Sequence, residues 1–331
     1  MKSEEITRKI FTLADQTQED SPLKSIILDT DPGVDDALAI ILAINSPEIE
    51  IEAITTVAGN VNHSKAHNNA KKLLEFTGKT NIPVCSGAVK PLVGVNRHAE
   101  RIHGKTGLGN AVLPKPDVKT HPVGAVEMIL KKSKELGKDL TLVSIGPLTN
   151  IASAILADPE LPIKVGGLVL MGGAFNLTPY GYGNANPVAE FNIWHDPEAA
   201  KIVFDSGVEL TCAGLDVTNH PDNRMGEKMF EDIKNANTQR SRLIVNLCED
   251  VMRRFNGFSL HDPMAIAYII SPSIFKTGRS LVEVELQGQI TRGMTVVERR
   301  PFKRIKDETN AKIITEVNAE KFHKMIRDRV R

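Results

Sequence analysis

The chain has 331 residues, of which 41% are apolar and 25% are charged, a composition typical of a globular protein with a sizeable core. Lys plus Arg and Asp plus Glu both number 41, so the formal net charge is zero and gives no overall attraction to nucleic acid or to an anionic membrane. No apolar run approaches the roughly 20 residues that span a bilayer. We therefore expect a protein that binds neither nucleic acid nor membrane.

Two further features bear on the cellular compartment. Residues 1–22 are charged throughout and lack the apolar core of a signal peptide. The three cysteines, Cys85, Cys212 and Cys248, are far apart and show no CxxC spacing, so we expect reduced, mostly buried thiols without a disulfide or zinc site. Both features predict a cytoplasmic location.

Apolar runs alternate with helical patterns along most of the chain. Strands are predicted at 24–30, 49–57, 82–87, 139–146, 166–173 and 208–217, and helices at 34–44, 64–76 and 148–157. This order predicts an α/β fold, a mainly parallel open sheet with helices on both faces, as in Rossmann-like proteins.

The C-terminal part has a different pattern. Residues 281–300 resemble an antiparallel pair of strands, followed by a short strand and a final helix from about Ala319. We therefore expect an antiparallel C-terminal edge on the sheet. Two long glycine-rich connections, 90–116 and 172–187, are candidates for lids or pocket walls.

No internal repeat or flexible linker is visible, so residues 25–331 are predicted to form a single domain. Residues 1–24 are then an N-terminal extension, helical or disordered. In a helix, Ile6, Ile10 and Leu13 would form one apolar stripe that could pack on a neighbouring subunit.

The stretch IILDTDPGVDDALAI, residues 26–40, places four aspartates within eight positions. Asp29 and Asp31 are two residues apart at the end of a strand, and Asp35 and Asp36 fall in the first turn of the next helix, where the helix dipole favours anions. A helix cap would explain one or two of these carboxylates, but gathering four without a cation is costly. Ligands of parallel sheets bind beyond the carboxyl ends of the strands. Oxygen ligands that converge there are typical of a Ca²⁺ or Mg²⁺ site.

One candidate for this chemistry is a Mg²⁺-dependent phosphatase of the haloacid dehalogenase type, which also places DxD after its first strand. Those enzymes need a downstream lysine and a second acidic pair, and nothing in the chain matches these well. Neither GxxxxGK[ST] nor GxGxxG after a strand is present, so other nucleotide signatures are missing too.

A second candidate accounts for more of the chain. DTDPGVDDALAI resembles the N-terminal signature of the inosine–uridine-preferring nucleoside hydrolases. The resemblance continues in family order through AITTVAGN, IHG, GPLTN, VLMGG, GNANPVAEFN, DPEAA and HDPMAIAY, the last of which spans 261–268. It implies hydrolysis of the N-glycosidic bond of a purine or pyrimidine ribonucleoside to ribose and free base, through an oxocarbenium-like transition state.

The resemblance also implies a metal site. One Ca²⁺ would be held by Asp31, Asp36, Asp262 and the backbone carbonyl of Ile145, and Asp31 would be the general base. Position 145 is often threonine in relatives, but only a carbonyl is needed there. Asp29 is expected to order the loop rather than bind metal.

The remaining site residues implied by the resemblance bind the two halves of the substrate. The ribose would contact Asp35, Asn60, Asn184, Glu190 and Asn192. His261 would help the base to depart, and the base pocket would be formed by His103, Phe255 and Phe258. Asp196, before Pro197, is expected to cap a helix.

The chain departs from the family pattern just before His261. Relatives tend to carry tyrosine in this segment, whereas the aromatic residues here are Phe255 and Phe258, which stack on a base but transfer no proton. Arg253 or Arg254 could contact the base, although a solvated helix face is the simpler interpretation. The base preference therefore stays open.

Three functions remain as alternatives. The favoured one is a Ca²⁺-dependent ribonucleoside hydrolase of nucleoside salvage or catabolism, whose partner is a small-molecule ribonucleoside. The others are the phosphatase and a non-catalytic nucleoside-binding protein on the same scaffold. Family members commonly form homodimers or homotetramers, and the sequence does not choose between them.

Overall fold

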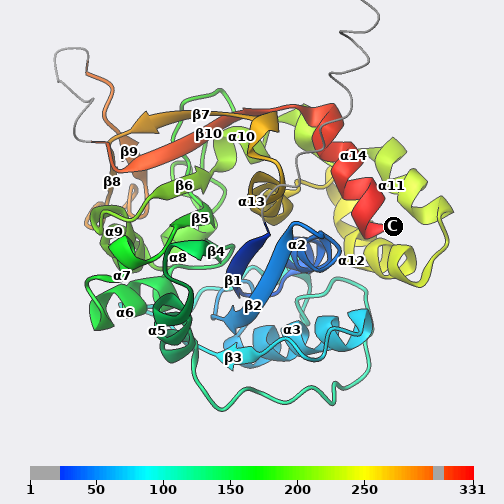
Figure 1. The fold of residues 1–331 in the computed structure, drawn as a ribbon. Helices are drawn as coiled ribbons and strands as arrows, with labels where there is room; N and C mark the ends of the chain where they lie inside the picture. The colour runs from blue at the N-terminus through cyan, green and yellow to red at the C-terminus, as the bar shows by residue number, and fades with distance from the viewer. Residues whose placement is uncertain (1–22, 301–308) are drawn as a thin grey trace, which may run out of the picture.

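The computed structural model describes residues 23–300 and 309–331. Its centre is an eight-stranded sheet in the order β3-β2-β1-β4-β5-β6-β10-β7, in which only β7 runs antiparallel to its neighbour (Figure 1). The strands are β1 (Lys24–Thr30), β2 (Ile49–Thr56), β3 (Val84–Ser86), β4 (Leu140–Ser144), β5 (Gly167–Met171), β6 (Leu210–Ala213), β7 (Phe275–Ser280) and β10 (Ala311–Val317). The predicted fold class, including the antiparallel edge, is confirmed.

The edge strand itself differs from the one expected. The predicted antiparallel pair within 281–300 exists as β8 (Val282–Val284) and β9 (Thr295–Val297), but it forms a separate two-stranded sheet. The antiparallel edge of the main sheet is β7, whose middle residues are exposed and too polar to give a strand pattern.

Helices cover both faces of the sheet (Figure 1). One face carries α2 (Val34–Ile44), α3 (His63–Thr77), α11 (Glu227–Asn235), α12 (Gln239–Phe255), α13 (His261–Ile270) and α14 (Ala319–Val330). The other carries α5 (Ala125–Leu136), α6 (Thr149–Ala157), α7 (Leu161–Lys164) and α9 (Pro197–Asp205). Along β1, Ile26 and Leu28 pack into the first core and Ile27 into the second, each fully buried. Burial on both faces contributes about 1.5–3 kcal/mol per side chain and explains the unbroken apolar run.

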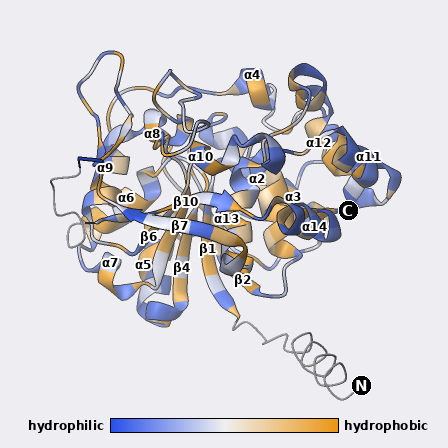
Figure 2. Cartoon of the chain, turned by 90° about the horizontal axis from the view of Figure 1, so that it is seen from above, coloured by the Kyte–Doolittle hydropathy of each residue, from blue (hydrophilic) through white to orange (hydrophobic). Residues whose placement is uncertain are grey.

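Three short helices lie beyond one end of the strands. Figure 2 shows α4 (Glu100–His103), α8 (Phe191–His195) and α10 (Leu215–Thr218) there, beyond the largely apolar strands. Single 3₁₀ turns complete the structure: η1 (Gly137–Asp139), η2 (Pro221–Asn223) and η3 (Pro272–Ile274). The segments after β1, β2, β4 and β5 also lead to this end, so it collects the predicted site residues.

Several local predictions are confirmed, and one concerns residues that the structure does not describe. The helix predicted at 34–44 coincides with α2, and the final helix begins at Ala319. All three cysteines are buried free thiols. The stripe of Ile6, Ile10 and Leu13 lies outside the described residues. No helix in the described ranges is long and apolar enough to cross a bilayer.

Candidate active site

A cavity of about 480 Å³ opens at the carboxyl end of the sheet. It is lined by every predicted site residue except Asp31 and Asp36, which are fully buried. The predicted residues along its wall are Asp35, Asn60, His103, Ile145, Asn184, Glu190, Asn192, Phe255, Phe258, His261 and Asp262. The strand order thus brings segments as far apart in the sequence as Asp35 and Asp262 to one cavity.

The floor of the cavity is an acidic cluster. Asp35, Asp36 and Asp262 each offer a carboxylate oxygen, and these oxygens all lie within 4.8 Å of one another. Burial together with the negative charge of Asp36 raises the pKa of Asp35 to about 8. Burial and the neighbouring carboxylates also raise the pKa of Asp31 and of Asp262 well above the ordinary range. The cluster therefore resists full ionisation unless a cation balances it.

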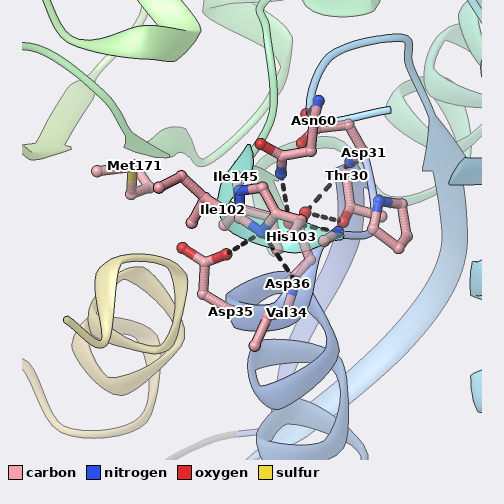
Figure 3. Close-up of polar contacts among 12 residues, drawn as sticks. Thr30, Asp31, Val34, Asp35, Asp36, Asn60, Ile102, His103, Ile145 and Met171 are labelled. Atoms are coloured by element: carbon pink, nitrogen blue, oxygen red, sulfur yellow. Dashed lines mark hydrogen bonds and ion pairs between the residues drawn. The ribbon is translucent and has the colours of Figure 1, made fainter. Parts of the chain in front are cut away.

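Asp36 is the most firmly held member of this cluster (Figure 3). Its carboxylate accepts hydrogen bonds from Thr30 Oγ1 at 2.6 Å, Asp31 N at 3.2 Å, Gly33 N at 2.9 Å and Asn60 Nδ2 at 2.9 Å. Gly33 is the residue just before α2, and Asp36 is the third residue of the helix. The bond from Gly33 N to the Asp36 carboxylate is therefore one half of a capping box. The turn after β1 and the start of α2 are thereby locked together.

Asp31 lies just beyond the end of β1. Its Oδ2 accepts the backbone N–H of Asn60 at 2.5 Å, while its Oδ1 is buried without a partner. A Cβ on Gly59 would lie 2.0 Å from Oδ2, and one on Gly146 would lie 2.7 Å from Oδ1. The glycines of VAGN and GPLTN therefore leave the space that the Asp31 carboxylate occupies.

The oxygen atoms of this floor fit a divalent cation. Asp31 Oδ1 and Asp35 Oδ1 are buried atoms without hydrogen-bond partners. The carbonyl of Ile145 faces the same region and accepts Asn192 Nδ2 at 3.1 Å, which leaves its second lone pair free. A donor set made only of carboxylate and carbonyl oxygen suits hard cations such as Ca²⁺ or Mg²⁺ rather than zinc.

The residues expected to bind ribose are fixed by bonds within the protein. Glu190 caps α8, because its carboxylate accepts the N–H groups of Asn192, Ile193 and Gly173 at 2.8, 3.1 and 3.2 Å. Burial nevertheless raises the pKa of Glu190 to about 7. Asn192 Nδ2 also donates to Met171 O, and Asn184 Oδ1 accepts Phe191 N–H at 2.9 Å.

The two predicted histidines differ in their partners. His103 Nδ1 accepts the Val34 N–H at 3.1 Å and lies 3.7 Å from Asp35 Oδ1 (Figure 3). Burial lowers the pKa of His103 to about 4, so the imidazole is neutral at pH 7 and the contact with Asp35 is not an ion pair. His261 Nδ1 bonds Thr218 Oγ1 at 2.8 Å, and burial lowers its pKa to about 4 as well.

Several lining residues were not predicted. Arg224, Tyr182, Met171 and Ile102 lie on the cavity wall. Arg224 stands in a connection that no motif or periodicity marks, and Tyr182 lies in the glycine-rich connection 172–187, a predicted candidate for a pocket wall. Met171 lies within the motif VLMGG and Ile102 within IHG. Those two motifs were the signals that could have identified Met171 and Ile102.

Arg253 and Arg254, in the last turn of α12, do not line the cavity. Arg253 pairs with Asp250 on the surface. Arg254 donates through Nη1 to Arg101 O at 2.6 Å and through Nη2 to Ile102 O at 3.3 Å. It therefore ties the end of α12 to α4, the helix that carries His103.

Comparisons with known proteins identify the family. The model of the inosine-uridine preferring nucleoside hydrolase family matches residues 26–324. The chain is 40% identical over 314 residues, 93% of its length and 98% of the relative's, to the pyrimidine-specific ribonucleoside hydrolase RihA of Photobacterium profundum.

Solved structures agree as well. The plant nucleoside hydrolase PpNRh1 matches with a TM-score of 0.84 and 33% identity over 93% of this chain and 99% of its own. The purine-preferring ribonucleoside hydrolase of Gardnerella vaginalis matches with a TM-score of 0.84 and 32% identity over 93% and 98%. The resemblance inferred from the motifs is confirmed: the chain belongs to the inosine–uridine preferring nucleoside hydrolase family and is an enzyme that hydrolyses the N-glycosidic bond of ribonucleosides.

Proposed function

We propose that the protein is a Ca²⁺-dependent ribonucleoside hydrolase in which Asp31, Asp36, Asp262 and the carbonyl of Ile145 hold the metal. The observation that carries this proposal is the group of carboxylate oxygens of Asp35, Asp36 and Asp262 within 4.8 Å of one another, together with two buried oxygens without hydrogen-bond partners, Asp31 Oδ1 and Asp35 Oδ1. Ca²⁺ accepts six to eight oxygens in flexible geometry, which leaves positions for water and ribose hydroxyls. When bound, it balances the carboxylates and makes water more acidic.

Asp31 is the proposed general base. Its Oδ2 is anchored by the Asn60 N–H, so the carboxylate keeps one orientation. Its Oδ1 has no partner and is free to take the proton of the attacking water. The water oxygen forms the new bond to C1′ on the side of the acidic cluster, where negative charge stabilises an oxocarbenium-like ribose.

The ribose is assigned to Asp35, Asn60, Asn184, Glu190 and Asn192. In the described part of the chain, Asn192 Oδ1 and Asn184 Nδ2 make no protein hydrogen bond, which supports a role in binding hydroxyls. A buried group that loses its hydroxyl partner costs about 1–3 kcal/mol. We therefore expect 2′-deoxynucleosides to be poor substrates.

The base is assigned to the wall formed by His103, Phe255, Phe258 and His261. Phe258 is 4% exposed and Phe255 is 48% exposed, so one ring is fixed and the other stands at the cavity mouth. His261 is held by Thr218, lines the cavity and precedes Asp262 in the chain, which supports a position near the departing base. It is proposed to help the base depart, and because burial lowers its pKa to about 4 it does so as a neutral imidazole that donates a hydrogen bond.

Pyrimidine ribonucleosides are the proposed preferred substrates. The relative at 40% identity is pyrimidine-specific, whereas the solved structure at 32% identity is purine-preferring. The higher identity supports the pyrimidine preference.

The test is base release from uridine, cytidine, inosine, adenosine and guanosine, first with Ca²⁺ and then with a chelator. Release that the chelator abolishes and Ca²⁺ restores, fastest from uridine and cytidine, is the expected result. Phosphate released from nucleotides, with no base released from any nucleoside, would instead point to the phosphatase alternative. Tight nucleoside binding without turnover would favour a non-catalytic protein.

Three wider features are also proposed. Residues 25–331 form one hydrolase domain, supported by the family match over 26–324. The chain assembles as a homodimer or homotetramer, supported by the exposed Val89, Val93 and Val95, and light scattering after size-exclusion chromatography measures the mass. A cytoplasmic location fits the three buried free thiols, and cell fractionation tests it.

A further inference from the structure

Arg224 follows η2 and belongs to the wall of the cavity. Its Nη2 donates to Gly257 O at 3.0 Å and to Phe255 O at 3.3 Å. The next residue, Met225, pairs with Phe258 through two backbone hydrogen bonds of 2.8 and 2.9 Å. Arg224 is thus fixed against the connection that carries both phenylalanines of the base wall.

The rest of its guanidinium is without a partner. In the part of the chain that the structure describes, Nη2 is the only nitrogen of Arg224 that donates a hydrogen bond. Nε is buried and unpartnered, and no carboxylate there forms an ion pair with this side chain. A half-buried cation without a counter-ion is costly, which indicates that an acceptor from outside the chain completes the site.

The positive and the negative side chains of the cavity come from different segments of its wall. Among the described residues that line it, Arg224 is the single arginine or lysine. The residue after it pairs with the apolar Phe258, whereas the carboxylates of the lining come from the starts of α2, α8 and α13. Breaking the glycosidic bond puts positive charge on the ribose and negative charge on the base. The carboxylates of the cavity can stabilise the first charge, and Arg224 can stabilise the second.

We propose that Arg224 is a leaving-group residue, which donates from Nε or Nη1 to an oxygen or ring nitrogen of the departing base. The inference rests on the proposed hydrolase function and adds a residue to it. As the C1′–N bond breaks, its electron pair moves into the base, where Arg224 stabilises it. The water oxygen bonds to C1′ and Asp31 receives the proton of the water, while neutral His261 donates a hydrogen bond to the base, which leaves as an anion and takes its proton from solvent.

This role fits a departure noted in the sequence. The segment from Cys248 to Leu260 lacks the tyrosine that relatives tend to carry near the base, and its phenylalanines offer no hydrogen bond. Arg224 supplies donors and charge at the same wall. Because the surroundings are largely apolar, its charge acts there more strongly than in water.

The experiment compares Arg224→Gln and Arg224→Lys with the wild type on uridine and on a nitrophenyl riboside, all with Ca²⁺. Arg253→Gln is the matched control, because Arg253 is an exposed arginine that pairs with Asp250 on α12. In Arg224→Gln we expect kcat on uridine to fall about 100-fold, the loss typical of removing one donor to developing charge. The nitrophenyl riboside, whose leaving group needs little help, should lose less than about 5-fold.

The outcomes separate a leaving-group role from a structural one. Arg224→Lys keeps the charge and should recover part of the uridine rate, while Arg253→Gln should match the wild type. Equal losses on both substrates, or a raised KM with unchanged kcat, would overturn the inference and make Arg224 a clamp for the Phe255–Phe258 connection. Inactive wild type on every nucleoside would reject the proposed function itself, which is a different result.

Discussion

Asn150 Nδ2 donates to Asp29 Oδ1 across 2.7 Å, joining the start of α6 to the end of β1. The same amide group donates to Thr56 O at 3.1 Å, and its oxygen accepts the Ala88 N–H at 2.8 Å. Asp29 Oδ1 also accepts Thr55 Oγ1 at 2.6 Å. The Asp29 side chain is therefore bound to β2 and to α6, and the asparagine of GPLTN connects the ends of β1 and β2 with the residues after β3.

Asp29→Asn should leave the enzyme active. Both donors to Asp29 reach the same oxygen, Oδ1, which an asparagine retains, while the amide nitrogen takes the place of the unpartnered Oδ2. Burial raises the pKa of Asp29 from 3.8 to about 7, so the wild type loses stability as pH rises from about 4 to 7. The free energy of unfolding of Asp29→Asn, measured with urea, should therefore rise relative to that of the wild type when the pH is raised from 5 to 8. Its kcat on uridine should be nearly unchanged.

The control for that variant is Asn150→Ala. It leaves Thr56 O and the Ala88 N–H without partners and should cost about 1–3 kcal/mol of unfolding free energy. Loss of Ca²⁺ binding in Asp29→Asn would contradict the structural role of Asp29.

Asp31→Asn should remove both functions proposed for that carboxylate. The amide keeps roughly the volume of Asp31 but accepts no proton, so kcat should fall by about 10²–10⁴-fold. Calorimetry should also show weaker Ca²⁺ binding, because one anionic ligand is lost. A variant with kcat close to that of Asp29→Asn would show that the base lies elsewhere.

Metal removal should destabilise the protein more at high pH than at low pH. Burial and Asp36 raise the pKa of Asp35 from 3.8 to about 8 in the metal-free fold. The unfolded chain loses this proton near pH 4 and the folded chain near pH 8, so metal-free stability falls across that interval. Ca²⁺ offsets the repulsion, and its stabilising effect should therefore grow with pH.

Thermal unfolding with Ca²⁺ and with chelator, at pH 5 and pH 8, measures this effect. The expected result is a larger difference in Tm at pH 8. A difference that is equal at both values, or larger at pH 5, would show that the cluster does not bind the cation through its ionised carboxylates.

The sequence predicted the parts of the fold that depend on local pattern. The helix at Val34–Ile44 was predicted with its observed bounds, because an apolar periodic run follows a turn and two aspartates. β7 was missed because its side chains are exposed and polar, and it is held mainly by pairing with β10. Long-range pairing of that kind leaves no periodic signal in the strand itself.

In the candidate site too, a local motif marks some residues, whereas other contacts depend on long-range packing. Asp31 and Asp36 stand in a motif whose clustered carboxylates have a chemical reason, so the sequence alone predicts them as site residues. The bond between Asp29 and Asn150 joins residues 121 apart, and Arg224 enters the cavity from an irregular connection. Contacts of this kind depend on the order of the strands, which a single sequence does not specify at the level of side chains.

Gly59→Ala should disturb the site through Asp31. A Cβ at this position would lie 2.0 Å from Asp31 Oδ2 and 2.8 Å from Pro147 Cδ, so either the carboxylate or the loop has to move. Such overpacking costs about 1–3 kcal/mol. The displaced carboxylate would lose the Asn60 N–H bond, and we expect kcat to fall by about 10-fold or more and Ca²⁺ affinity to weaken.

Gly226→Ala is the matched control for this change. Gly226 begins α11 with φ of −88°, and a Cβ there meets no atom within 4 Å. Its activity and Ca²⁺ affinity should equal those of the wild type, measured by uridine hydrolysis and calorimetry. If Gly59→Ala also behaved as the wild type, the Asp31 carboxylate would not occupy the position beside Gly59 in the working enzyme, and its assignment as base and ligand would fail with it.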